Sequence, residues 1–191
     1  IERLEIYKRS AEKFVDHGYE SVGLDHFILP SDRMAVAHRN RTLTRNFQGY
    51  STDESTYLLG LGASAIGNVP QGYAQNTPSI EDYRAAIAAG RFATSRGIAL
   101  NGEDALRGAI IHDLMCYLDV DLARHCMTHG ADISMFAEAI AKLQPLIQKG
   151  VVTYDSGKIA IRPDAPQLAR IVSAAFDRHL SDSERGFAQV A

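Results

Sequence analysis

The sequence predicts a mixed α+β fold that is mainly helical and ends in a winged-helix-like arrangement. Several segments repeat apolar residues with the 3.6-residue period of a helix, and residues 57–66 form a nearly unbroken apolar run, which is typical of a buried strand. After residue 150 the pattern changes to that of a β-hairpin and a last helix. We expect a strand-containing part, residues 1–100, and a helical part, residues 101–191, with the hairpin near residues 151–162.

The first expected elements are a helix and a strand. Residues 3–17 place apolar side chains on one helical face, and Gly18 is a suitable C-cap. Residues 19–24 follow as an extended run that ends at Asp25 and His26. Ligands of α/β folds bind at the carboxyl ends of strands, so both side chains are candidates for a site. For His26 a proton-transfer role stands beside a structural bond to Asp25.

Glycines and capping residues organise the next part of the chain. Ser31 can cap a short helix that ends near Arg39. The run 57–66 is expected to be a strand buried on both faces, or its exit loop. Gly60 and Gly62 would allow close approach to its backbone, but without a third glycine they are a weak dinucleotide-binding signal.

Five further helices are expected. Ser79 and Asn101 each begin a capping signature, and the others follow from apolar spacing. Their expected ranges are 79–90, 101–117, 122–129, 136–150 and 168–180.

Composition excludes several classes of protein. The chain of 191 residues is 46% hydrophobic and 23% charged, which fits a globular domain and not a collagen-like, disulfide-scaffold or disordered one. A net charge of −3 gives no overall attraction to nucleic acid or anionic lipid. No apolar run approaches the ~20 residues of a membrane helix, so no membrane association is expected. Two cysteines ten residues apart indicate a reducing compartment, which predicts a cytoplasmic protein.

Six short strings occur in a specific order, and together they resemble one family. They are Gly23-Leu-Asp-His-Phe27, Arg45-Asn-Phe-Gln-Gly-Tyr50, Leu59-Gly-Leu-Gly-Ala-Ser-Ala-Ile66, Tyr73-Ala-Gln-Asn76, Arg96-Gly97 and Leu114-Met-Cys116. The set resembles the oxygen-independent coproporphyrinogen III oxidases, radical S-adenosylmethionine enzymes of haem biosynthesis. Small departures lie beside the strings, at Arg41, Thr44 and the pair Ile28-Leu29.

The resemblance implies a reaction and also a missing part. The family converts two propionates of coproporphyrinogen III to vinyl groups, giving protoporphyrinogen IX, with S-adenosylmethionine and a [4Fe–4S] cluster held by three cysteines. This chain has only Cys116 and Cys126 and no such motif. It is therefore expected to be a C-terminal fragment, inactive alone: residues 1–100 as the end of a partial TIM-type barrel and residues 101–191 as the helical domain.

The resemblance also implies site residues and partners. Phe47 and Gln48 are expected to contact S-adenosylmethionine, and Ile66 to pack near it; the alternative is a core Phe47 and a loop-bracing Gln48. Arg45 is the candidate for binding substrate carboxylates, while Arg39 and Arg41 are more typical of a solvated basic loop. No catalytic residue is expected within the fragment. An electron donor and a monomeric parent are implied, and unpaired strand edges make dimerisation of the fragment plausible.

Other classes of function remain alternatives. Pairs of possible metal ligands share helix faces within residues 112–129, but zinc needs about four converging ligands, so no metal is expected; the residues are His112, Cys116, His125, Cys126 and His129. A DNA-binding winged helix is disfavoured because residues 134–149 carry no basic stripe. A haem chaperone-like relative and a stand-alone module are the remaining rivals.

Overall fold

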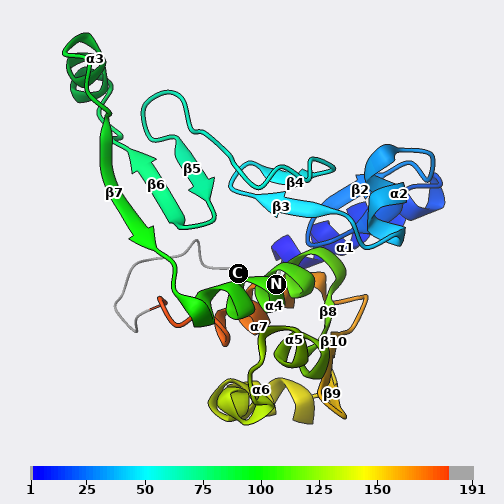
Figure 1. Cartoon of the computed structure of the whole chain (residues 1–191). Coiled ribbons are helices and arrows are strands. Elements are labelled where there is room, and N and C mark those ends of the chain that lie inside the picture. The colour runs from blue at the N-terminus through cyan, green and yellow to red at the C-terminus, as the bar shows by residue number, and fades with distance from the viewer. Residues whose placement is uncertain (1, 181–191) are drawn as a thin grey trace. The chain divides into compact units, whose positions relative to one another are not determined.

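The computed structural model describes residues 2–180 and contains two compact units (Figure 1). Residues up to Thr52 and from Leu106 onward form the first unit, and Asp53–Ala105 form the second. Among the described residues no helix is long and apolar enough to cross a membrane.

The first unit begins with two helices and four short strands that pair as two antiparallel hairpins. Its elements up to Thr52 are α1 (Glu2–Asp16), β1 (Glu20–Val22), β2 (His26–Ile28), α2 (Arg33–Arg39), β3 (Thr44–Asn46) and β4 (Gly49–Ser51). Helix α1 matches the predicted helix, and Gly18 after it has φ +83. Helix α2 is capped by Asp32, one residue later than predicted: its carboxylate accepts from Met34 N at 2.7 Å.

The predicted single strand before Asp25 is wrong. β1 and β2 form an antiparallel hairpin with Val22 opposite His26, so three residues make the turn. Gly23 in that turn has φ +59, a left-handed conformation that glycine adopts at no steric cost. Asp25 thus lies in a turn and His26 begins the second strand, and neither lies at the carboxyl end of a parallel strand.

The helical part of the first unit follows its prediction closely. It contains α4 (Gly102–Tyr117) from Leu106 onward, β8 (Asp119–Asp121), α5 (Leu122–His129), η1 (Ile133–Phe136), α6 (Ala137–Gln148), β9 (Val152–Asp155), β10 (Lys158–Ile161), η2 (Pro166–Leu168) and α7 (Ala169–Ala174). Two residues with positive φ, Ser156 and Gly157, join β9 to β10 in the predicted hairpin. The last helix ends six residues before Leu180, where the prediction ended it.

One strand of this part was not predicted. β8 pairs antiparallel with β10, which gives a three-stranded sheet in the order β8-β10-β9. The helices pack on this sheet around one core in which Phe136 and Phe176 are fully buried with ring centroids 5.5 Å apart. Helices followed by a small antiparallel sheet are the predicted winged-helix-like arrangement.

The second unit is a three-stranded antiparallel sheet with one helix. Its elements are β5 (Ile66–Val69), β6 (Gly72–Asn76), α3 (Ile80–Ala88) and β7 (Thr94–Ala99), and the strand order is β5-β6-β7. The Ser79 hydroxyl caps α3 by accepting from Asp82 N at 3.2 Å, as predicted. A strand over residues 57–66 is wrong: that run is a loop in which Leu59 and Leu61 are 77% and 89% exposed. Its alternative, a loop, is what forms.

The predicted class, mixed α+β and mainly helical, is confirmed, since helices make up 44% of the structure. All strand pairings among residues 2–180 are antiparallel, whereas a TIM-type barrel is built from parallel strands. The assignment of residues 1–100 to the end of a barrel, and the division near residue 100, remain predictions.

Candidate functional site

The predicted ligand-binding side chains Phe47 and Gln48 form the tip of the β3–β4 hairpin. Asn46 pairs with Gly49, so these two residues are the whole turn. The Asn46 carboxamide oxygen accepts from Gln48 N at 2.8 Å, which fixes the turn from within. Phe47 is 56% exposed, so it is not a core residue. The turn therefore presents an aromatic ring and an amide on an ordered support.

Tyr50, the last residue of the same string, joins the hairpin to two other segments. Its hydroxyl donates to Met115 O at 2.7 Å and accepts from Leu24 N at 3.0 Å. Burial raises the pKa of Tyr50, so the hydroxyl stays protonated and able to donate at neutral pH. Three of the strings that carry the family resemblance thus meet at one side chain, a role that sequence reasoning missed.

The Tyr50 ring has polar neighbours on its face and at its edge. The Arg45 guanidinium lies over the ring, 4.6 Å from its centroid, and the His26 ring meets it edge-on at 4.8 Å. Among the described residues no carboxylate pairs with Arg45. The cation–π contact thus orients the Arg45 guanidinium, and its N–H groups are available to bind an anion. His26 Nδ1 lies 2.9 Å from Asp25, in agreement with its structural interpretation.

The other two arginines of the basic segment are occupied by carboxylates of this chain. Arg39 donates to both carboxylate oxygens of Glu20, at 3.0 and 2.8 Å. Arg41 lies 2.9 Å from Asp119 and 4.2 Å from the centroid of the Tyr117 ring. The earlier interpretation of both as solvated loop residues is therefore only half right: they are partly exposed, but they hold segments together.

A half-buried polar cluster surrounds Asp113 on α4. His125 Nε2 lies 2.8 Å from one carboxylate oxygen, and His112 Nδ1 lies 3.5 Å from the other. Burial alone would raise the pKa of Asp113, but the two histidines and Arg41 together lower it. Asp113, with Cys116 beside the ring, raises the pKa of His112 to about 9. The cluster therefore holds a protonated imidazole against a carboxylate at neutral pH.

The metal alternative gains no support from this cluster. Within residues 2–180 no three His, Cys, Asp or Glu side chains are placed to hold a metal ion. His112 lies 3.7 Å from the Cys116 sulfur, but Cys126 is buried in the core and the His129 ring bonds to His125 O. The members of each i,i+4 pair thus lie on one helix face, as their spacing predicts.

Ile66, the third predicted cofactor contact, belongs to the second unit and begins β5, where it is partly buried. The glycine loop before it is held by Asn76, whose Nδ2 donates to Gly60 O and Gly62 O, both at 3.0 Å. A Cβ on Gly60 would lie 2.8 Å from the Ile66 carbonyl carbon, so the glycine is needed for close approach of this chain's own backbone. The string at 73–76 thus braces the string at 59–66.

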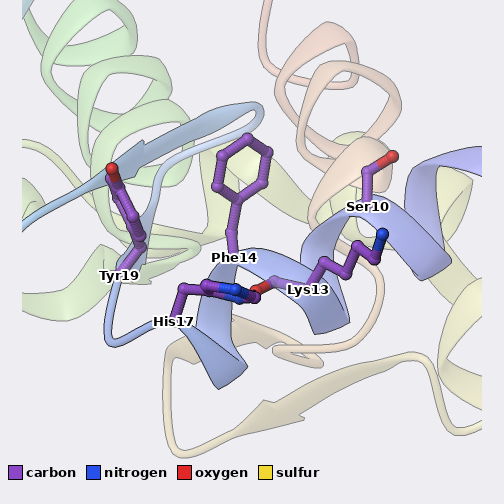
Figure 2. A pocket seen from close by; sticks show the side chains of 5 residues that line it. All are labelled: Ser10, Lys13, Phe14, His17 and Tyr19. Carbon is purple, nitrogen blue, oxygen red and sulfur yellow. The ribbon is translucent and has the colours of Figure 1, made fainter.

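A surface cavity of about 500 Å³ lies beside α1, and no predicted site residue lines it. Figure 2 shows its lining side chains: Ser10, Lys13, Phe14, His17 and Tyr19. The Phe14 ring stacks on Phe27 at 4.8 Å and meets Tyr19 edge-on at 5.4 Å, so an aromatic cluster forms its apolar wall. Ser10, Lys13 and His17 are its polar lining residues.

Comparisons with known proteins agree with the strings. The chain is 46% identical, over 92% of its length, to an oxygen-independent coproporphyrinogen III oxidase of Bradyrhizobium diazoefficiens, and covers 39% of that protein. It is 36% identical, over 96% of its length, to the protein of that name in Pseudomonas aeruginosa, of which it covers 40%. No family model matches the chain.

A solved structure agrees as well. Coproporphyrinogen III oxidase (HemN) from Escherichia coli, described as a radical SAM enzyme, is matched with a TM-score of 0.86 and 35% identity over 93% of this chain and 41% of that one. The chain thus spans about two fifths of the length of the curated relatives it matches. Over nearly its whole length, the chain is homologous to a C-terminal part of the oxygen-independent coproporphyrinogen III oxidases.

Proposed function

We propose that the complete protein that contains this chain is an oxygen-independent coproporphyrinogen III oxidase of haem biosynthesis. It oxidatively decarboxylates two propionates of coproporphyrinogen III to vinyl groups and forms protoporphyrinogen IX. The observation that carries the proposal is the 46% identity over 92% of the chain to a protein of that name. The free, buried cysteines Cys116 and Cys126 support a reducing, cytoplasmic setting.

The described residues do not fit a [4Fe–4S] cluster. The two cysteines lie apart, neither belongs to a three-cysteine motif, and no metal-binding group forms among residues 2–180. We therefore propose that the cluster is bound by another part of a monomeric complete protein, and that a separate electron donor reduces it. We also propose that this chain alone is inactive. As an isolated fragment it would dimerise through its unpaired strand edges.

In this proposal Phe47 and Gln48 contact S-adenosylmethionine, and Ile66 packs near such a molecule. The exposed Phe47 ring offers a flat apolar face to an adenine, and the Gln48 amide can donate and accept hydrogen bonds. Two observations support it: the turn that contains Phe47 and Gln48 is ordered, and Asn76 holds the loop that leads to Ile66. Bound S-adenosylmethionine would supply the radical chemistry, and the chain's side chains would orient it.

Arg45 is the proposed contact to a substrate propionate. Its guanidinium is oriented by the Tyr50 ring and has no carboxylate partner among the described residues, unlike Arg39 and Arg41. A planar fork of this kind suits bidentate binding of a carboxylate.

Variants of the complete protein test these assignments. Phe47→Ala is expected to raise the Kd for S-adenosylmethionine about tenfold, which corresponds to the loss of ~1.4 kcal/mol of binding free energy.

Arg45→Ala is expected to raise the KM for coproporphyrinogen III and leave the Kd for S-adenosylmethionine unchanged. Arg170→Ala, on the surface of α7, is the matched control for loss of a charge. Equilibrium binding and initial rates give both constants, and values equal to those of the unsubstituted protein would contradict the assignments.

A haem chaperone-like protein is the second candidate. It would bind haem and release it intact instead of forming vinyl groups. The products that the complete protein forms from coproporphyrinogen III distinguish the two candidates.

A further inference from the structure

We propose that Tyr50 is a positioning residue for S-adenosylmethionine binding. Its hydroxyl attaches the β3–β4 hairpin to α4, and the turn of that hairpin contains Phe47 and Gln48. This inference rests on the proposed function of the hairpin. It assigns to the helical part of the chain the role of a support for the ligand-binding turn.

The first observation is the geometry of the Tyr50 hydroxyl. It donates to a carbonyl of α4, at Met115, and accepts from the backbone N–H of Leu24, over sequence separations of 65 and 26 residues. The Leu24 carbonyl in turn accepts from the Tyr7 hydroxyl at 3.2 Å, which holds the β1–β2 turn on α1. One side chain of β4 therefore connects the hairpin to two separate supports.

The second observation is the space around that hydroxyl. A Cβ built on Gly23 would lie 2.0 Å from the Tyr50 oxygen, so the turn accommodates the phenol only with glycine at this position. The two hydrogen bonds and the space left by glycine at position 23 together fix the place of the Tyr50 hydroxyl.

The third observation is a matching attachment of the other strand. The Tyr117 hydroxyl donates to Leu43 O at 2.9 Å, at the residue before β3, and Arg41 beside it pairs with Asp119 at 2.9 Å. The hairpin is thus held to the end of α4 through both of its strands, and its turn is left to project. A turn held in this way presents Phe47 and Gln48 in one orientation, which lowers the ordering cost of binding a ligand.

Tyr50→Phe in the complete protein tests the inference, because it keeps the ring and removes only the hydroxyl. Without the two hydrogen bonds the turn is no longer held in one orientation, and ordering it adds to the cost of binding, so we expect the Kd for S-adenosylmethionine to rise about tenfold. The kcat at saturating S-adenosylmethionine should change less than twofold. Tyr154→Phe, on the exposed strand β9, is the control and should leave the Kd unchanged. Equilibrium dialysis with labelled S-adenosylmethionine measures the Kd, and circular dichroism verifies folding.

Each outcome decides the matter. A merely structural role for Tyr50 would lower the active fraction, so kcat would fall with an unchanged Kd, and that result overturns the inference. If Phe47→Ala raises the Kd but Tyr50→Phe does not, the inference fails and the proposed function stands. If neither does, both fail. If Tyr50→Phe does not fold, Gly23→Ala replaces it, because its methyl group displaces the Tyr50 hydroxyl, and an unchanged Kd in that variant overturns the inference.

Discussion

Gly23→Ala is expected to lower the free energy of unfolding by about 3 kcal/mol. The left-handed backbone at φ +59 costs a non-glycine residue roughly 1 kcal/mol. The added methyl would also lie 2.0 Å from the Tyr50 oxygen, and overpacking of this kind typically costs about 1–3 kcal/mol. Relief of the clash requires Tyr50 to move away from Leu24 and Met115, so its two hydrogen bonds are lost as well. Urea unfolding measures the loss.

Gly130→Ala is the matched control for this prediction. Gly130 has φ +64, close to that of Gly23, but a Cβ there meets no atom within 4 Å. The control therefore carries only the backbone cost of roughly 1 kcal/mol. If the two substitutions lower the free energy of unfolding equally, the packing and hydrogen bonds of the Tyr50 hydroxyl contribute nothing to stability.

His112 is expected to make stability fall between about pH 6.5 and about pH 9. Its pKa is raised from 6.5 to about 9 by Asp113 and by Cys116, so the folded state binds a proton that the unfolded chain has released in that interval. The stabilisation is complete below pH 6.5 and is lost as the pH rises through the folded value. A shift of this size corresponds to about 3 kcal/mol, and with 35% of the side chain exposed, solvent screening reduces the expected effect to about 1–2 kcal/mol.

The comparison of two histidine variants isolates this effect. The free energy of unfolding of the unsubstituted protein should fall between pH 6 and pH 9. In His112→Gln this fall should be smaller by about 1–2 kcal/mol. His17→Gln, which removes an exposed ring just after α1, is the control. Urea unfolding at both pH values gives the difference. Equal slopes for His112→Gln and the unsubstituted protein would show that Asp113 does not hold a proton on His112.

The helical part was predictable because its signals are local. The apolar spacing of Leu106, Ile110 and Leu114 gives the face of α4 that is now buried, and Asn101 N donates to Asp104 as its capping signature implies. β8 escaped prediction because a strand of three residues with two aspartates is recognisable only by its pairing with β10.

The errors in the first hundred residues have a common physical cause. The run 57–66 has the composition of a buried strand, but two glycine carbonyls in it bond to the Asn76 side chain and not to a neighbouring strand. The same limit applies to the site. Phe47, Gln48 and Arg45 could be proposed from a string of six residues, whereas Tyr50 gains its role from partners 26 and 65 residues away. Contacts of that length are set by the fold, and no local pattern encodes them.

Product analysis of the complete protein tests the central proposal most directly. The protein would be purified without oxygen and incubated with coproporphyrinogen III, S-adenosylmethionine and a one-electron reductant. The proposal predicts protoporphyrinogen IX, with two vinyl groups formed and two molecules of CO₂ released per substrate molecule. Unchanged coproporphyrinogen III, with haem bound and released intact by the same preparation, would contradict it.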